Sequence, residues 1–424
     1  MVSFALTDEE RLVQQTAHDF AKREIRPVAA YYDEREEVPY DIIKKAAVVG
    51  FGISREGSLL DGGGSSLVPV ILAEELSWGC AGIALAINSS GLAGAAIMAT
   101  GSPEQREKWM AAIASDANEV HLGAMCLTEP DAGSDVANIQ TTARRDGDDY
   151  ILNGEKQFIT NGNIADVHVV FATEDRSKGW GGIGAYVIPR GTPGLEEGTT
   201  WKKMGIRASH TANVVLNECR IPAENKLGAA PKGGGSAGPG ALGALMTLER
   251  TRPVVGAYAL GIGRAAYEYA LDYARDRVQF GKSIMKNQGI SFMLADMAMA
   301  VDSARLMVWR AAWMAGANAP YLQAEGSMAK AFASDMAMKV TVDAVQVLGG
   351  QGFMRDHPVE KWVRDAKIFQ IFEGTNQIQR MVIGRAIEAL PKRTRANRPL
   401  AVSSAAPGCC SSSCSPPCRP SRRP

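Results

Sequence analysis

The sequence has few of the residues that build metal centres. Its histidines are dispersed without the i, i+4 spacing of metal ligands and without carboxylate partners nearby in the sequence. The five are His18, His121, His168, His210 and His357. No GxSxG motif is present, so the sequence also gives no sign of a serine nucleophile. We therefore expect neither a bound metal nor a histidine-assisted nucleophile.

Cysteine is also scarce in the body of the chain. Of seven cysteines, only Cys80, Cys126 and Cys219 precede the C-terminal tail. The other four are Cys409, Cys410, Cys414 and Cys418. Their spacing does not match two CxxC pairs and no histidine follows them, which disfavours a zinc site. The body is typical of a reduced, cytoplasmic protein.

The chain lacks an excess of charge of either sign. Lys plus Arg and Asp plus Glu both number 46, so no overall basic field favours nucleic acid or an anionic membrane. The N-terminus reaches acidic residues at once and does not resemble a secretory signal. The most apolar stretch, residues 80–100, is interrupted by polar Asn88, Ser89 and Ser90, which predicts a buried helix pair rather than a membrane span.

A chain of 424 residues with 46% hydrophobic content is long enough for several domains. Helical periodicity marks residues 1–120 and 244–391, whereas short β-rich runs separated by turn residues fill 121–226. A Gly-rich connector spans 227–243, and a Pro-, Ser- and Arg-rich tail, 392–424, is predicted to be disordered. We predict an α+β fold, mostly α, with an N-terminal helical domain, a middle barrel- or sandwich-like β domain and a C-terminal four-helix bundle.

Local motifs support this organisation. Residues 102–105 combine an N-cap serine, a first-turn proline and a capping-box glutamine, which predicts a helix start. Asn153-Gly154 predicts a two-residue hairpin turn. The GxGxxA pattern at 261–266 lies within a helical run without a preceding strand, so it predicts close helix packing rather than dinucleotide binding. A bundle seam is predicted from Ile290, Leu294, Met297, Val301, Ala304, Val308 and Ala311.

Glu373 is the candidate for chemistry. It lies where one apolar helix ends and another begins, with Gly374 as the break and Thr375 as the N-cap of the second helix. A carboxylate facing a dry cavity there has a raised pKa, which suits it to removing a weakly acidic proton from carbon. From residue type alone, an exposed helix-end glutamate is the alternative.

Two further segments, residues 125–135 and 158–162, each run from a strand into a polar, glycine-bearing turn. Hydroxyls at Thr128 and Thr160 and the backbone N–H groups beside them can bind a ligand. As isolated residues, both threonines are equally compatible with ordinary strand ends. In combination with the segment around Glu373, the two threonines become a specific indication of a functional site.

Taken together, these motifs closely resemble the acyl-CoA dehydrogenases, and within them the medium-chain type. The resemblance covers residues 5–390. It rests on LTEPDAGSD at 127–135, FITNG at 158–162, ERTRPVV at 249–255, DRVQFGK at 276–282, QVLGGQGF at 346–353 and VEKWVRDAKIFQIFEGTNQIQR at 359–380. It implies a helical, β, helical subunit, bound FAD and a homotetramer arranged as a dimer of dimers.

The resemblance also implies roles for individual residues. Glu373 is similar to the catalytic base of the family, and Ser134, Glu249, Arg252, Phe372 and Gly374 to substrate-binding positions, with Arg252 meeting the CoA nucleotide. The resemblance implies cofactor contacts at Thr128, Phe158, Thr160, Thr375 and Gln377. It also implies FAD contacts donated by a neighbouring subunit, at Arg277, Phe280, Gln288, Gln346, Gly349 and Gly350.

The sequence departs from the family pattern at several of these positions. Phe158 replaces a common tryptophan, which keeps an aromatic plate against the flavin but loses the indole N–H. Phe372 replaces a frequent tyrosine. Some branches place the base on the earlier helix near Thr251, which cannot serve as one, so that alternative requires Glu249 to reach the site. Ala84 and Asn88 correspond to positions near the floor of the acyl pocket.

The implied reaction is α,β-dehydrogenation of a fatty acyl-CoA to the trans-2-enoyl-CoA. Glu373 removes the Cα proton while flavin N5 takes the Cβ hydride, and an electron-transferring flavoprotein then accepts the electrons. The alternatives are an acyl-CoA oxidase that uses oxygen, a catalytically silent flavoprotein scaffold and a nucleic-acid-associated relative. Retention of Glu373 disfavours the silent form, and the zero net charge disfavours the nucleic-acid form. Acyl chain length stays open.

Overall fold

The computed structural model describes residues 5–55, 65–228 and 240–390, without the side chains of 240–248 and 250. The chain divides into a compact unit, Met1–Glu388, and a second unit, Ala389–Pro424. Most of the predicted connector at 227–243 and the predicted disordered tail with its four cysteines lie outside the described residues.

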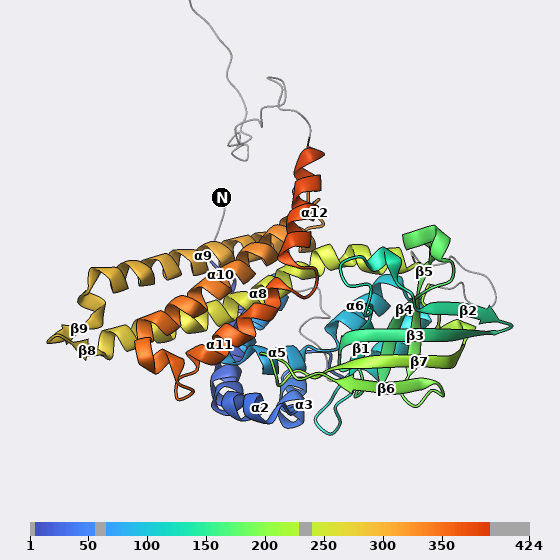
Figure 1. Cartoon of the computed structure of the whole chain (residues 1–424), viewed down its shortest axis with the longest axis horizontal. Helices are drawn as coiled ribbons and strands as arrows, with labels where there is room; N and C mark the ends of the chain where they lie inside the picture. Colours follow the sequence, from blue (N-terminus) through green and yellow to red (C-terminus); the bar gives the residue numbers. More distant parts are fainter. Residues whose placement is uncertain (1–4, 56–64, 229–239, 391–424) are drawn as a thin grey trace, which may run out of the picture. The chain divides into compact units, whose positions relative to one another are not determined.

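Helices form the first part of the compact unit (Figure 1). They are α1 (Asp8–Phe20), α2 (Ala29–Arg35), α3 (Tyr40–Val48), α4 (Val68–Gly79), α5 (Ala81–Ile87), α6 (Gly91–Thr100) and α7 (Pro103–Ala112). The predicted capping box is confirmed, because Ser102 and Gln105 bond reciprocally at the start of α7. The segment Ala81–Thr100 is apolar enough to cross a membrane by length and composition, but it is 61% buried within the protein. It consists of α5 and α6 separated by a turn, as the predicted helix pair requires.

The middle of the chain forms a seven-stranded sheet with the order β1-β4-β2-β3-β7-β6 and β5 paired to β4. Its strands are β1 (Gly123–Cys126), β2 (Thr142–Asp146), β3 (Asp149–Thr160), β4 (Val167–Thr173), β5 (Ile183–Pro189), β6 (Leu195–Thr200) and β7 (Thr211–Pro222). Alternate residues of β4 enter two different apolar clusters. Val169 packs with residues of α6 and α7, whereas Val170 packs with residues of β3 and β7. The sheet therefore has apolar packing on both faces.

The predicted hairpin turn at Asn153-Gly154 is wrong. Strand β3 continues through these residues, and the tight turn lies at residues 147–148, where Asp146 pairs with Asp149. At Asn153 the register with β7 shifts, and the Asn153 amide bonds to the Glu218 side chain and backbone N–H at 2.7 Å each. Gly154, with φ of +147°, is needed for this bulge rather than for a turn.

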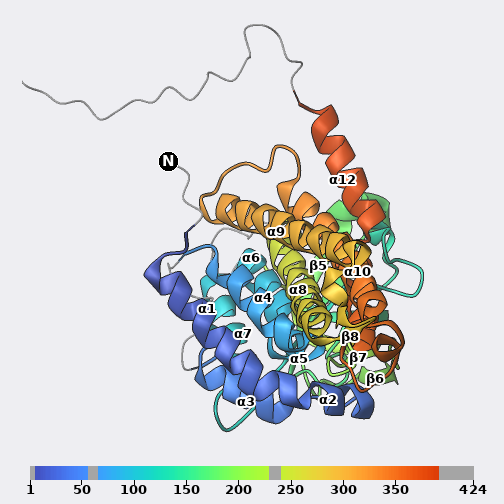
Figure 2. The same cartoon turned by 90° about the vertical axis from the view of Figure 1, so that its left-hand side faces the viewer.

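The C-terminal part has three long helices that pack against one another, α8 (Gly240–Asp276), α9 (Gln288–Gly316) and α10 (Glu325–Leu348) (Figure 2). Two shorter helices follow, α11 (Val359–Ala366) and α12 (Asn376–Glu388), and α12 projects away from the others. Helix α8 contacts α4 as well as α9 and α10. A short hairpin, β8 (Val278–Gln279) and β9 (Lys282–Ser283), connects α8 to α9. The predicted seam is confirmed, since its residues from Leu294 onward are buried in α9. The fold-class prediction of helices, sheet and helices is likewise confirmed.

Glycines allow α8 to approach its neighbours closely. A Cβ on Gly261 would lie 2.2 Å from the Glu74 carbonyl oxygen, and one on Gly263 would lie 2.7 Å from the Met336 sulfur. Gly261 is therefore required for this packing, because backbone atoms of α4 leave no room for a Cβ, whereas at Gly263 the flexible Met336 side chain could move aside. This confirms the packing interpretation of the GxGxxA pattern.

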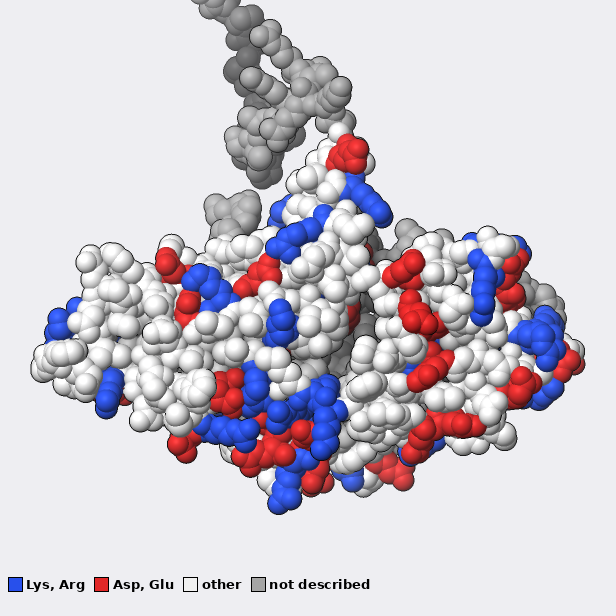
Figure 3. Space-filling view, in the orientation of Figure 1, with Lys and Arg blue, Asp and Glu red and all other residues white. Residues whose placement is uncertain are grey.

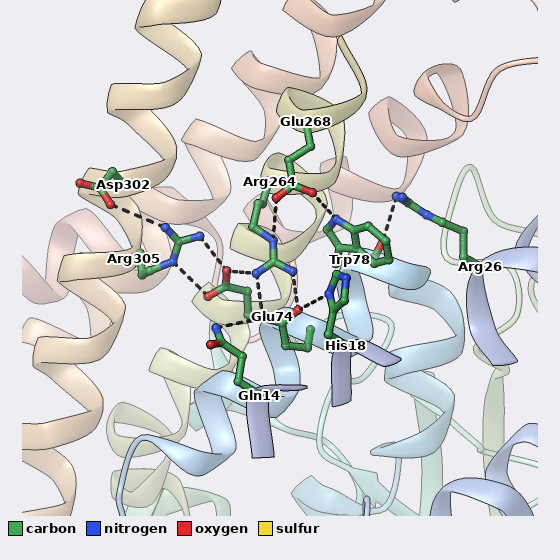
Figure 4. Close-up of polar contacts among 10 residues, drawn as sticks. Gln14, His18, Arg26, Glu74, Trp78, Arg264, Glu268, Asp302 and Arg305 are labelled. Carbon is green, nitrogen blue, oxygen red and sulfur yellow. Dashed lines mark hydrogen bonds and ion pairs between the residues drawn. The ribbon is translucent and has the colours of Figure 1, made fainter. Parts of the chain in front are cut away.

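A buried ionic network joins four helices in this region (Figure 4). Glu74 and Glu75 of α4 have side chains only 2% exposed, and Arg264 of α8 lies 2.8 Å from an oxygen of each. Arg305 of α9 bonds Glu74 at 2.8 Å, and His18 of α1 bonds Glu75 at 2.9 Å. Burial alone would raise the pKa of Glu75, but Arg264 and His18 outweigh it and lower the pKa. The paired charges fix the relative positions of α1, α4, α8 and α9.

Helix α11 is tied to both preceding parts of the chain. Arg364 donates to Asp33 of α2 at 2.7 Å and to the Met204 carbonyl oxygen at 3.1 Å. The adjacent Asp365, fully buried, accepts from the Ile206 N–H at 2.6 Å. These bonds fix α11, and therefore the segment around Glu373 that follows it.

The bulge at Gly154 provides a stability test. In Gly154→Ala, the added Cβ meets Thr141 Oγ1 at 2.6 Å and its Cα at 2.8 Å, and the φ of +147° is strained for alanine. We expect a loss of about 2–4 kcal/mol in the free energy of unfolding, measured by chemical denaturation. In the control, Gly91→Ala, a Cβ has no neighbour within 4 Å. Equal stability of both variants would contradict this role of Gly154.

Candidate active site

A sharp turn presents Glu373 between two helical segments. The chain passes from α11 through the 3₁₀ turn η8 (Lys367–Gln370) and re-enters helix at α12. Glu373 and Gly374 both have left-handed backbones, with φ of +52° and +89°. For a glutamate this conformation is strained, which is common at functional positions. The Thr375 hydroxyl accepts the Ile378 N–H at 3.2 Å, which confirms the predicted N-cap of α12.

The carboxylate of Glu373 lies inside the protein. Its Oε2 atom is buried and has no hydrogen-bond partner among the described residues, although the residue as a whole is half-buried. Burial raises the pKa of this carboxyl to about 7, against the opposing charges of Lys330 and Arg252. The exposed helix-end alternative is therefore wrong. The environment provides the desolvated carboxylate that the sequence predicted.

Three polar side chains hold this turn, and none of them was predicted as a site residue. Lys330 of α10 donates to the Gly374 carbonyl oxygen at 2.8 Å and to Asn376 Oδ1 at 3.0 Å. Gln379 Nε2 donates to the carbonyl oxygens of Glu373 and Gly374 at 3.1 and 2.9 Å. Both strained carbonyls are thus satisfied. The one signal for Lys330 was a lysine between Ala329 and Ala331 in a helix rich in small residues.

Glu249 and Arg252 lie close to the same site but are bound to each other. Glu249 accepts the Ser327 N–H at 2.9 Å and the Ser327 hydroxyl at 2.8 Å, and it also pairs with Arg252. Arg252 additionally donates to the Ser327 hydroxyl at 2.7 Å. The Glu249 carboxylate is therefore engaged, in contrast to the unpartnered oxygen of Glu373.

Tyr258 and Asn88 lie near Glu373. Tyr258, 6% exposed, stacks on Phe369 with ring centroids 6.4 Å apart, and the Asn88 side chain is a neighbour of its hydroxyl. Burial and the nearby Glu373 charge raise the pKa of Tyr258. Phe372, predicted to contact substrate, packs edge-on against Phe369 at 5.1 Å. A buried tyrosine thus lies between the end of α5 and the candidate base, which the sequence did not reveal.

The two strand-end segments meet in the sheet. The Thr128 carbonyl oxygen, just after β1, accepts the Gln157 N–H of β3 at 2.8 Å. Phe158 has a φ of +59°, its side chain is 56% exposed, and its ring packs against Trp201 at 5.4 Å. Thr160 ends β3 and is half-buried. The structure therefore places Thr128 beside the part of β3 that carries Phe158 and Thr160.

A buried ion pair fixes the first of these segments. Lys156 Nζ lies 2.6 Å from Glu129 and 3.1 Å from the Leu127 carbonyl oxygen, with side chains 0% and 3% exposed. Glu129 also accepts the Thr141 N–H at 3.0 Å. Burial lowers the pKa of Lys156 despite its partner. This pair anchors residues 127–129 to β3. Sequence reasoning missed it because Glu129 and Lys156 are ordinary surface residues by type.

A second group of predicted residues lies around the β8–β9 hairpin. Arg277, Phe280 and Gly350 line a cleft of about 470 Å³ there, and Phe280 is 97% exposed. Exposed near the same helix ends are Gln288, Gln346 and Gly349. Figure 1 places this hairpin at the opposite end of the compact unit from β1 and β3. Within one chain, these residues therefore do not meet Thr128 and Phe158.

The remaining predicted residues are more exposed. Ser134, in the turn that follows residues 127–129, and Gln377, in the first turn of α12, are both exposed. Thr375 is half-buried at the cap of α12. In the described ranges, no group of three or more His, Cys, Asp or Glu side chains could hold a metal ion.

Three family models cover most of the chain. The N-terminal, middle and C-terminal domains of acyl-CoA dehydrogenase match residues 7–117, 124–219 and 238–388. A short-chain-specific acyl-CoA dehydrogenase of Clostridium acetobutylicum is 41% identical over 91% of this chain and 100% of that protein.

Solved structures agree with this match. The butyryl-CoA dehydrogenase of Megasphaera elsdenii has a TM-score of 0.83 at 40% identity, covering 91% of this chain and 100% of that one. A chain from a structure described for the electron transferring flavoprotein of Acidaminococcus fermentans has a TM-score of 0.84 at 40% identity, covering 92% and 100%.

The family prediction is confirmed, although the curated relative named above is of the short-chain rather than the medium-chain type. Matches at this identity over most of the chain assign the protein to one family. The chain belongs to the acyl-CoA dehydrogenase family and is an FAD-dependent oxidoreductase.

Proposed function

We propose that this protein oxidises a short-chain acyl-CoA to its trans-2-enoyl-CoA, with Glu373 as the base. The observation that carries the proposal is the buried Oε2 of Glu373, which has no partner among the described residues. The short-chain substrate class is supported by the Clostridium and Megasphaera relatives. The neighbouring Glu249 is an unsuitable base because Arg252 and Ser327 already bind its carboxylate.

The strand ends fit a flavin ring. Phe158 offers an aromatic face that is 56% exposed, beside the polar ends of the strands that carry Thr128 and Thr160. We assign these three residues to the ring, and Thr375 with Gln377 to the adenosine end. FAD, when bound, supplies the redox chemistry by accepting the hydride that leaves Cβ.

The residues of the chain provide the proton transfer and its environment. Glu373 accepts the Cα proton, and its pKa of about 7 balances the basicity of the carboxylate against its ionised fraction near neutral pH. Its backbone N–H is assigned to the thioester oxygen, where it stabilises the charge that develops as the proton leaves. Burial of the surrounding side chains excludes water from the reacting carbons.

We propose that Tyr258 and Asn88 limit the acyl chain. Tyr258 is buried near Glu373 and is held in place by stacking on Phe369, with Asn88 as a neighbour of its hydroxyl. A longer acyl chain would have to displace this buried, packed ring, which costs packing energy.

We also propose that copies of this chain associate with one another. The β8–β9 cleft and the flavin-ring residues lie at opposite ends of the compact unit (Figure 1), so a second copy is needed to bring them together. Exposed apolar side chains recur at seven-residue spacing along α9, at Phe292, Met299, Leu306 and Trp313. In Figure 3 most of the surface over the β8–β9 hairpin is uncharged, whereas charged residues gather below α11. Such a surface supports a homotetramer.

Family membership and the Acidaminococcus structure support an electron-transferring flavoprotein as the electron acceptor. The same membership supports an enzyme that acts on a CoA thioester in fatty acid metabolism.

Glu373→Gln tests the base. We expect the variant to retain FAD and the wild-type oligomer, while the rate of flavin bleaching by butyryl-CoA under anaerobic conditions falls by at least about 10²–10⁴-fold. Glu249→Gln is the matched control. Rapid bleaching in Glu373→Gln, or its loss only in Glu249→Gln, would assign the base elsewhere.

The pH dependence follows from the buried carboxyl. Glu373 must be ionised to accept a proton, and burial raises its pKa to about 7. The rate of flavin reduction should therefore fall as pH drops through about 7, whereas an exposed glutamate would stay active to a much lower pH. A stopped-flow rate that stays constant down to pH 5 would refute the desolvated base.

Tyr258→Ala tests the limit on chain length. The optimum among acyl-CoAs of four to twelve carbons should move to longer chains, because removal of the phenol ring leaves room for additional carbons. Tyr258→Phe keeps the ring and loses only the hydroxyl, so its optimum should stay with short chains. An unchanged optimum in Tyr258→Ala would show that other residues set the length.

A further inference from the structure

Lys330 is unusual because its side chain is completely buried, which is rare for a lysine. Its side chain in α10 is 0% exposed, and its ammonium donates to two neutral oxygens, Gly374 O at 2.8 Å and Asn376 Oδ1 at 3.0 Å. Burial lowers the pKa of Lys330 to about 8, with Glu373 as the strongest opposing influence. An uncharged side chain could fill the same space at a smaller desolvation cost. The retained charge therefore points to a role beyond packing.

The ammonium is held on both sides of the turn that carries Glu373. Asn376, its second acceptor, is fixed by donating to Ser334 Oγ at 2.9 Å and to Asp335 at 2.7 Å. Gln379 donates to the same Gly374 oxygen at 2.9 Å. The lysine therefore has a defined position relative to the Glu373–Gly374 backbone, not a range of rotamers.

We propose that Lys330 is a positioning residue that holds the left-handed turn at Glu373 through the Gly374 carbonyl oxygen and places a buried positive charge at that turn. The inference rests on the proposed role of Glu373 as the base. Through Gly374 O, the lysine stabilises a backbone conformation that glutamate rarely adopts. Through space, its charge opposes the desolvation of the Glu373 carboxylate.

Other charged groups near the pair are few among the described residues. Arg252 of α8 also favours the ionised form of Glu373, and it disfavours the charged form of Lys330. Asp335 of α10 favours the charged lysine, but Arg380 of α12 pairs with it at 2.7 Å. Tyr258 faces Glu373 from α8. Since Arg252 is bound to Glu249, Lys330 is the cation that also contacts the turn itself.

The test compares Lys330→Met with Lys339→Met in the FAD-bound protein. Lys339 lies on the same helix but is 62% exposed and pairs with Asp343 at the surface. In Lys330→Met, the acid limb of butyryl-CoA-dependent flavin reduction should move up by about one pH unit. The rate at pH 6 should fall about tenfold more than the rate at high pH, where any remaining loss reports the missing contact with the turn. Lys339→Met should match the wild type.

Two measurements that do not depend on turnover complete the test. The infrared carboxyl band that disappears in Glu373→Gln should titrate at a higher pH in Lys330→Met. Affinity for a non-oxidisable alkyl-thioether of CoA should change by less than about twofold, because binding energy from the rest of the ligand is retained. A purely structural lysine would instead lower the rate equally at every pH and weaken this binding.

An unshifted infrared titration and acid limb in Lys330→Met would overturn the inference. If Lys330→Met does not fold, Lys330→Gln, which keeps polar hydrogens in the buried site without the charge, carries the same comparison. If none of the acyl-CoAs reduces the flavin of the wild type, the proposed function fails. The infrared titration still decides the role of Lys330 in that case.

Discussion

The opposition between desolvation and two nearby cations at Glu373 governs the site. Burial raises the pKa of this carboxyl and so favours its protonated form, while Lys330 and Arg252 favour its ionised form. The pKa of about 7 is the balance of these effects. Such a balance requires the carboxylate, the cations and the surrounding apolar side chains to hold fixed positions, because small displacements change both the desolvation and the attraction.

The fold provides that rigidity from distant parts of the sequence. Arg364 and Asp365 attach α11 to residues of the N-terminal helices and of the sheet region, so the segment that leads to Glu373 is fixed from two directions. The ionic network centred on Glu74 and Glu75 in turn fixes α4 against α8 and α9. Both arrangements are largely buried, where paired charges define geometry more than they add stability.

Much of the fold could be predicted from local patterns, because helix caps and apolar periodicity depend on neighbouring residues. The capping box at Ser102, the cap at Thr375 and the α9 seam are such cases. The prediction of a hairpin turn at Asn153-Gly154 was wrong because the same dipeptide suits a turn or a bulge. The contact with Thr141 that requires glycine is not local in sequence. Lys330 and the Lys156–Glu129 pair were missed for the same reason, since charged residues are usually exposed and only tertiary contacts bury these.

The central claim is that Glu373 faces the carbon from which the proton leaves. A crystal structure of the FAD-bound protein with a non-oxidisable butyl thioether of CoA tests it most directly. The account predicts a Glu373 carboxylate oxygen about 3–3.5 Å from the carbon that corresponds to Cα, on the opposite side of the chain from the flavin. A carboxylate turned into solvent, or a ligand whose reacting carbons lie away from Glu373, would contradict it.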